Sequence, residues 1–139
     1  MKVRDAMTGT VDTISPATTV LEAARRMRDD DIGAIPVAEN DRLVGMVTDR
    51  DLVVRSLADA HDVATTSVSD AMSSGVLYCF DDQSGKEVLE MMEKQQVRRM
   101  PVVDHDKNLV GIVTLGDLAV EGDEEKAGDA LEGISQPVH

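Results

Sequence analysis

Three short blocks of sequence occur twice in this chain, in the same order, with the copies about 65 residues apart. The paired blocks are Val3–Thr8 and Val68–Ser73, Ile32–Val37 and Val97–Val102, and Leu43–Thr48 and Leu109–Thr114. One extra residue in the second copy falls in a polar turn, where an insertion costs little. A period this long, present only twice, is not typical of a solenoid, so we predict a duplication that gives two paired half-domains.

Both copies have the same predicted order of elements. An extended stretch (11–15 and 76–80) leads into a helix that opens with a capping box, Thr19 with Glu22 and Ser84 with Glu87. In the first copy, two short strands follow at 34–38 and 43–47, and a second helix opens at Thr48. Each copy therefore has the predicted order strand, helix, strand, strand, helix. This repetition predicts an α/β (α+β) fold of two tandem repeats.

The predicted boundaries follow from this pattern. Repeat 1 occupies residues 1–62, repeat 2 occupies 63–120, and 121–139 form an acidic tail that we expect to be flexible. A unit of about 60 residues is only marginally stable alone. We therefore expect the two repeats to pack face to face about a pseudo-twofold axis.

Composition excludes several classes of function. The net charge of −13 disfavours nucleic acid and anionic membranes as partners. Tyr78 and Phe80 are the only aromatic side chains, which argues against capture of a ligand by stacked rings. The single cysteine, Cys79, has no disulfide partner, and no stretch approaches 18 apolar residues. We expect a soluble cytoplasmic protein.

The repeated motifs resemble those of the CBS domain, and the tandem resembles a Bateman module. Each copy has Asp-Ala-Met at its start, apolar-x-x-apolar-Pro-Val in its middle and Gly-apolar-Val-Thr-x-x-Asp at its end. The resemblance covers about residues 1–120, and the lack of an attached catalytic domain is similar to the small stand-alone bacterial CBS-pair proteins of the stress or hypoxic-response type. It implies a homodimeric regulatory protein of signal transduction. The implied ligand in the inter-repeat cleft is AMP, ADP, ATP or S-adenosylmethionine, bound as a regulatory ligand and not as a catalytic cofactor.

The Thr-x-x-Asp pairs at the start of the second helices allow two interpretations. Thr48 with Asp51, and Thr114 with Asp117, have the spacing of a capping box, although aspartate reaches back less easily than glutamate. Alternatively, the carboxylates accept hydrogen bonds from ribose hydroxyls and the threonines donate to ribose or phosphate. The two interpretations are compatible.

Arg98 and Arg99 occupy the positions that Gly33 and Ala34 have in the first copy. They are either solvated surface charges or a clamp for phosphate, which guanidinium groups bind through two hydrogen bonds. The resemblance places basic residues here in nucleotide-binding copies. This asymmetry predicts that only one of two clefts is well equipped for phosphates.

Gly33 and Ala34, with the neighbouring positions Ile35, Pro36, Met100 and Pro101, are predicted to be mainly strand and core residues. The resemblance adds that their backbone, with that around Thr13 and Tyr78, lines the adenine pocket. Gly45 and Gly111 are predicted to be glycines of close approach or of a strand bend, because no phosphate-binding glycine motif is present.

Enzyme and metal functions are not expected. His61, His105 and His139 lie at linker, turn and tail positions without the spacing of metal ligands. The alternative to a nucleotide sensor is a ligand-free structural module of the same fold, which contacts an unidentified protein partner. Gly33 and Ala34 in place of basic residues favour that alternative.

Overall fold

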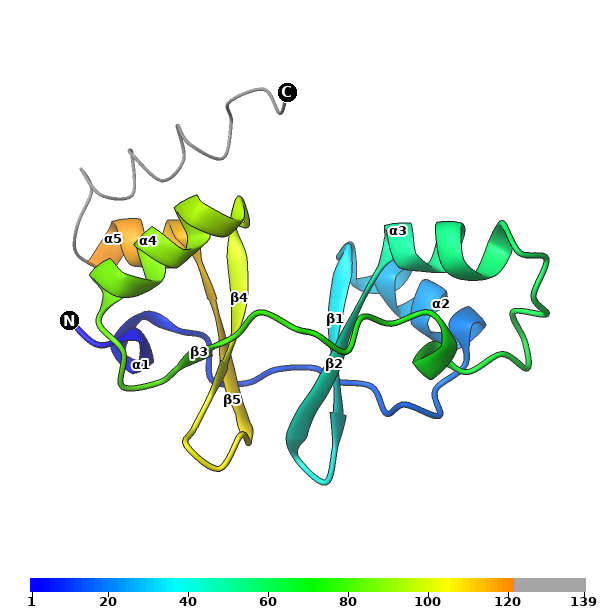
Figure 1. Cartoon of the computed structure of the whole chain (residues 1–139), viewed down its shortest axis with the longest axis horizontal. Helices are drawn as coiled ribbons and strands as arrows, with labels where there is room; N and C mark the ends of the chain where they lie inside the picture. The colour runs from blue at the N-terminus through cyan, green and yellow to red at the C-terminus, as the bar shows by residue number, and fades with distance from the viewer. Residues whose placement is uncertain (122–139) are drawn as a thin grey trace. The chain divides into compact units, whose positions relative to one another are not determined.

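The computed structural model describes residues 1–121, with side chains as far as Ala119, and divides them into two compact units (Figure 1). The middle unit is Asp12–Val76, and the terminal unit joins Met1–Val11 to the chain from Leu77 onward. The predicted acidic tail lies outside the described residues except for Glu121, which ends the last helix.

The middle unit contains one antiparallel hairpin and its helices. Helix α2 (Val20–Asp30) precedes β1 (Ala34–Glu39) and β2 (Arg42–Thr48), and α3 (Asp49–Leu52) follows. The predicted strand at 11–15 is reduced to a single parallel bridge between Ile14 and Val37. The second helix opens at Thr48 as predicted, but after α3 it widens into a π-helical turn, η1 (Val53–Leu57). Its Ala58 N–H donates to the carbonyl of Val53, five residues back, at 2.8 Å.

The terminal unit repeats this arrangement. It contains α1 (Val3–Ala6), β3 (Cys79–Phe80), α4 (Gly85–Gln95), β4 (Arg99–Val103), β5 (Leu109–Thr114) and α5 (Leu115–Glu121). Strand β3 pairs in parallel with β4, and β4 pairs antiparallel with β5. The predicted order of elements is therefore confirmed for this copy.

Each unit encloses its own aliphatic core. Ile35, Val37 and Val47 of the hairpin are fully buried in the middle unit against α2, and Met100, Val102 and Val113 are buried in the terminal unit against α4. The helices begin where the sequence predicts, because the Oγ atoms of Thr19 and Ser84 accept hydrogen bonds from the third helical amides.

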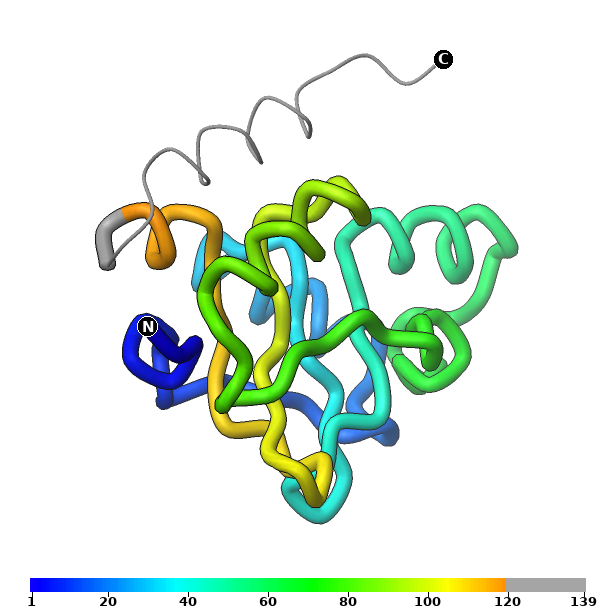
Figure 2. The backbone as a smooth tube through the Cα atoms, turned by 60° about the vertical axis from the view of Figure 1, so that its left-hand side comes forward, coloured from blue at the N-terminus to red at the C-terminus, as the bar shows by residue number. Residues whose placement is uncertain are grey.

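The Asp-Ala-Met segments pack on the opposite repeat. The first segment, 2–8, belongs to the terminal unit, where Val3 is fully buried and its N–H donates to Gln83 O at 2.9 Å. Figures 1 and 2 both show this segment beside α5. The second segment, 67–73, contains the 3₁₀ turn η2 (Val68–Asp70) and covers the middle unit, with Val68 in its core. The compact units thus exchange their first segments relative to the predicted repeats.

Gly45 and Gly111 explain how these segments dock. A Cβ atom at Gly45 would lie 2.6 Å from Met72 Sδ and 3.1 Å from Ser73 O, and one at Gly111 would lie 2.6 Å from Met7 Sδ and 2.8 Å from Thr8 O. Both strands therefore need a position without a side chain where the segment crosses them. The prediction of close approach is confirmed.

Candidate functional site

The predicted site residues divide between the two units, one complete set in each. The middle unit holds Thr13, Gly33, Ala34, Ile35, Pro36, Thr48 and Asp51, and the terminal unit holds Tyr78, Arg98, Arg99, Met100, Pro101, Thr114 and Asp117. No described contact tests the predicted cleft between the repeats, so each set is considered within its own unit.

Within each unit, the start of the first hairpin strand meets the start of the second helix. Ala34 pairs with Thr48 in the sheet register, and Arg99 pairs with Thr114. The first helical amide closes the corner: Asp49 N–H donates to Gly33 O at 3.0 Å, and Leu115 N–H donates to Arg98 O at 2.8 Å. We call these corners the middle junction (33–36 with 48–51) and the terminal junction (98–101 with 114–117).

Both junctions contain a closed capping box. Thr48 N–H donates to Asp51 Oδ2 at 2.9 Å, and Asp51 N–H donates to Thr48 Oγ1 at 3.1 Å. The equivalent bonds between Thr114 and Asp117 are both 3.0 Å long. The expectation that aspartate reaches back poorly is wrong, because the extended backbone of the capping threonine brings its amide close to the carboxylate. The capping interpretation is confirmed.

Capping leaves part of each pair available to a ligand. Only Oδ2 of each aspartate takes part in the cap, and Oδ1 has no hydrogen-bond partner among the described residues. Each threonine hydroxyl accepts one bond and keeps its own proton to donate. The four side chains are half-buried, so the junctions present fixed polar groups at the protein surface.

Arg98 and Arg99 are exposed, and neither forms a salt bridge with a described residue. Met100 and Pro101 behind them are buried, as are Ile35 and Pro36 in the middle unit. The strand and core interpretation of these apolar residues is confirmed. The terminal junction therefore has two exposed arginines at its edge, with no salt bridge to a described residue, next to residues buried in the core.

In the middle junction, the acidic side chain of Asp49 lies beside Gly33, the position equivalent to Arg98. The sequence reasoning missed this contact. A Cβ atom at Gly33 would lie 3.4 Å from Asp49 Oδ2. The other oxygen, Asp49 Oδ1, accepts a hydrogen bond from Arg50 N–H at 2.8 Å. The available signal was the first x of Thr-x-x-Asp, which is aspartate in one copy and leucine in the other.

Thr13 and Tyr78 directly precede the first strand pairing of each unit, the Ile14–Val37 bridge and β3. Thr13 O accepts a hydrogen bond from Arg26 Nη1 at 3.2 Å. The ring of Tyr78 turns away from the terminal junction, because it contacts Phe80 edge-on and lies 5.5 Å from Lys107 Nζ in the turn at the other end of the hairpin.

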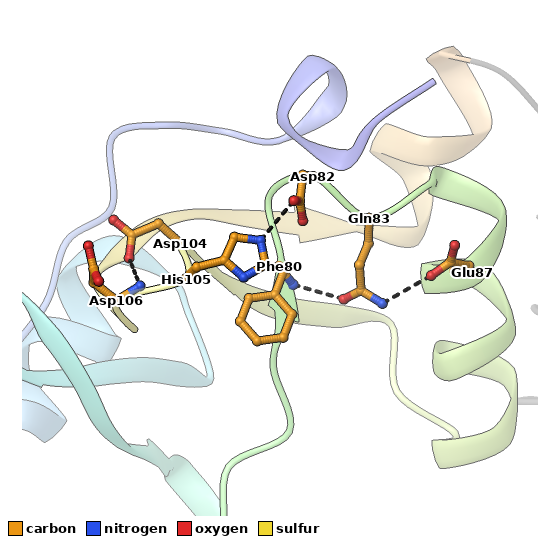
Figure 3. Close-up of polar contacts among 7 residues, drawn as sticks. All are labelled: Phe80, Asp82, Gln83, Glu87, Asp104, His105 and Asp106. Atoms are coloured by element: carbon orange, nitrogen blue, oxygen red, sulfur yellow. Dashed lines mark hydrogen bonds and ion pairs between the residues drawn. The ribbon is translucent and has the colours of Figure 1, made fainter.

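Figure 3 shows a polar cluster at that turn, which sequence reasoning also missed. His105 stacks on Phe80 with ring centroids 4.7 Å apart, and its Nε2 lies 2.7 Å from Asp82 Oδ2. The hydrogen bond with Asp82 raises the pKa of His105, and the same bond lowers the pKa of Asp82. This contact ties the β4–β5 turn to the loop after β3.

No three histidine, cysteine, aspartate or glutamate side chains lie together as metal ligands within residues 1–119. Cys79 is buried, and desolvation raises its pKa to about 12. Among the described helices, none is long and apolar enough to cross a membrane.

Comparison with known proteins decides the family. The family model described as "CBS domain" matches residues 3–58 and again residues 68–122. The chain belongs to the CBS domain family. CBS domain-containing protein YhcV of Bacillus subtilis is 45% identical over 139 residues, which are 99% of this chain and 98% of that protein. Hypoxic response protein 1 of Mycobacterium tuberculosis is 38% identical over 136 residues, 97% of this chain and 94% of that protein.

Solved structures of CBS proteins share the fold. The crystal structure of Hypoxic Response Protein I with two coordinated zinc ions has a TM-score of 0.79 and 39% identity, and covers 88% of this chain and 99% of its own. CBSX2 in complex with AMP has a TM-score of 0.74 at 27% identity over 86% and 93% of the two chains. The CBS domain pair of MJ0100, in complex with 5′-methylthioadenosine and S-adenosyl-L-methionine, has a TM-score of 0.71 at 26% identity over 86% and 94%. Adenosine-containing ligands thus occur among CBS-pair neighbours of this chain.

Proposed function

We propose that this CBS protein is a non-catalytic regulatory module that binds an adenosine-containing ligand through its two junctions. The observation that carries the proposal is the capping aspartate of each junction, whose Oδ1 is without a partner among the described residues and whose neighbouring threonine keeps a hydroxyl proton to donate. A ribose offers a vicinal diol, which can donate to such a carboxylate in short, charge-assisted bonds.

The residues around each aspartate suit the rest of an adenosine. The side chains of Ile35 and Met100 are buried in the cores, so a purine would meet the strand backbone at these positions, which can read its polar edge. Arg98 and Arg99 supply unpaired positive charge for phosphates at the terminal junction. AMP in CBSX2 and the two adenosine compounds in MJ0100 support this ligand class.

The proposal includes a cytoplasmic homodimer acting in signal transduction under stress, with the ligand in the cleft between repeats. Ligand binding would bias the packing of the two repeats, or of two protomers, through different affinity for the two states. The similarity to Hypoxic response protein 1 supports the stress role. The exposed apolar side chains Val53, Val54 and Leu57 on η1 supply surface of the kind that a protein interface buries.

A ligand-free interaction module of the same fold is the second candidate. It is favoured by the middle junction, where Gly33 and Ala34 replace the two arginines. Under this alternative, the exposed apolar surface of η1 binds a protein partner and no adenosine compound binds either junction.

A thermal-shift screen with AMP, ADP, ATP, S-adenosylmethionine and NAD separates the two candidates. A ligand at 100 times its Kd adds about 2.7 kcal/mol to stability, which is several degrees in Tm for a chain of this length. Asp117→Asn keeps an oxygen to cap Thr114 but removes the charge, so it should reduce the shift. Asp41→Asn makes the same charge change in the exposed β1–β2 turn and should leave the shift unchanged. If none of the five compounds raises Tm, the sensor proposal is wrong.

A further inference from the structure

The two junctions share a backbone but differ in the charges that they present. The amide of the first helical residue donates to the carbonyl of Gly33 in one unit and of Arg98 in the other. The pair Gly33 and Asp49 therefore corresponds in place to the pair Arg98 and Leu115. Arg98 therefore places a cation at the edge of the terminal junction, whereas the equivalent position in the middle junction, Gly33, lies beside the carboxylate of Asp49.

The Asp49 carboxylate is held beside Gly33. Its Oδ1 accepts a hydrogen bond from Arg50 N–H at 2.8 Å, while its Oδ2 lies 3.4 Å from where a Cβ of Gly33 would stand. Leu115, by contrast, is buried and has no polar side-chain atom. A ligand group at the edge of the middle junction therefore meets a built-in negative charge, and one at the terminal junction does not.

Arg50 partly offsets the negative charge of Asp49. It is exposed and adds one positive charge to the middle junction, where the terminal junction has Gly116. Successive helix residues project about 100° apart, so its side chain leaves α3 in a different direction from Asp49. Across positions 33, 34, 49 and 50 the charge is balanced, whereas positions 98, 99, 115 and 116 carry two uncompensated arginines.

Building on the proposed function, we propose that the two junctions select different members of one ligand class. The terminal junction takes an adenosine with 5′-phosphates, and the middle junction takes an adenosine whose 5′ substituent is neutral or cationic. Arg98 and Arg99 favour a phosphate at the terminal junction, and Asp49 disfavours one at the middle junction, because its carboxylate repels a phosphate and tolerates a thioether or sulfonium group. The adenosine part is bound in the same way at both places.

Isothermal titration calorimetry on the full chain tests the assignment with AMP and 5′-methylthioadenosine, which differ in charge at the 5′ position. Replacing Arg98 and Arg99 together by alanine should weaken AMP at least tenfold and 5′-methylthioadenosine less than twofold. Adding Asp49→Asn to that double variant should strengthen the residual AMP binding about fivefold at low ionic strength. That figure corresponds to a dianion and a carboxylate roughly 8 Å apart in a water-like dielectric. Binding of 5′-methylthioadenosine should change less than twofold.

Two further variants keep the test independent of folding defects. Gly33→Arg introduces the cation that the other junction has, at a position with no positive φ, and should also strengthen AMP binding in the same background. Asp41→Asn changes the net charge equally at the far end of the β1–β2 hairpin and should alter neither ligand. Circular dichroism melting identifies any variant that does not fold.

The outcomes distinguish this assignment from the proposed function. If neither AMP nor 5′-methylthioadenosine binds the unmodified protein, this assignment fails, and the proposed function fails with it only if none of the five compounds of the thermal-shift screen raises Tm. If adenosine compounds bind but Asp49→Asn and Gly33→Arg leave AMP affinity unchanged, the proposed function stands and the role of Asp49 is wrong. Two AMP sites of equal affinity per chain would also overturn the assignment.

Discussion

Replacing Gly111 by alanine should destabilise the terminal unit. The added methyl group would lie 2.6 Å from Met7 Sδ and 2.8 Å from Thr8 O. The methionine can move aside, but Thr8 O accepts the Ile112 N–H at 3.0 Å and belongs to the pairing of the first segment with β5. Relief of the clash therefore has to loosen that pairing.

The expected magnitude combines two opposing effects. Overpacking of this kind costs about 1–3 kcal/mol. Loss of conformational freedom in the unfolded chain stabilises an alanine variant by about 0.4–1 kcal/mol. The net loss should be roughly 0.5–2 kcal/mol, and Gly45→Ala should lose less, because its nearest backbone contact, Ser73 O, is at 3.1 Å.

Urea denaturation followed by circular dichroism measures the effect. Gly75→Ala is the matched control, because a Cβ atom there has nothing within 4 Å and φ is not positive, so the variant should be neutral or slightly stabilised. If Gly111→Ala proves as stable as Gly75→Ala, the close approach of the Asp-Ala-Met segment does not limit this position and the argument from the glycine is refuted.

Three other outcomes follow from contacts in the structure. Asp51→Ala should lower stability by about 0.5–2 kcal/mol in urea denaturation, because it removes the acceptor for Thr48 N–H at the start of α3, whereas an asparagine at the same position should lose less. The pKa of His105 is raised, so its ion pair with Asp82 stabilises fully below the unfolded histidine pKa of about 6.5 and is lost as the pH rises through the higher folded pKa. The urea midpoints of wild type and His105→Gln should therefore converge as the pH is raised from about 6.5, and a difference that stays constant with pH would contradict the ion pair. Cys79, with its pKa raised to about 12 by burial, should react with a thiol reagent only after unfolding, and rapid labelling of the native protein would show that the site opens.

Much of the local structure follows from side-chain chemistry that is visible in the sequence. Thr19 and Ser84 start helices because their hydroxyls satisfy free amides, and the same physics places Thr48 and Thr114 at the start of the second helices. The hairpins follow from alternating apolar residues on either side of a polar turn. These features depend on neighbours within a few residues, so one copy of each motif is enough to predict them.

The exchange of the first segments could not be predicted in this way. In a tandem repeat, the segment before each copy has the same apolar pattern whichever copy it covers. Val3 and Val68 are both valines, so their composition does not show which of the two cores each one enters. Hydrophobicity is non-directional, so the pattern states that the segment is buried but not where. The folded structure is needed to show that Met72 lies against Gly45 and Met7 against Gly111.

The charge difference between the junctions was visible only in part. Arg98 and Arg99 stand out because the first copy has Gly33 and Ala34 at those places. Asp49 was overlooked because an exposed acid in an acidic protein is ordinary, and its closeness to Gly33 depends on how the strand and helix meet. The direction of the Tyr78 ring was not predicted, because its contact with Lys107 joins residues almost thirty positions apart in the sequence.

The exchange of segments has a consequence for biosynthesis. The middle unit has all its residues once Val76 has been made, so it can close early, whereas Val3 has no core to enter until β4 and β5 have left the ribosome. The protein is therefore expected to fold from its centre outward, with its first residues among the last to be ordered. For the same reason, cutting the chain between the repeats would leave each fragment with one uncovered sheet face, because each half would carry the segment that the other half needs.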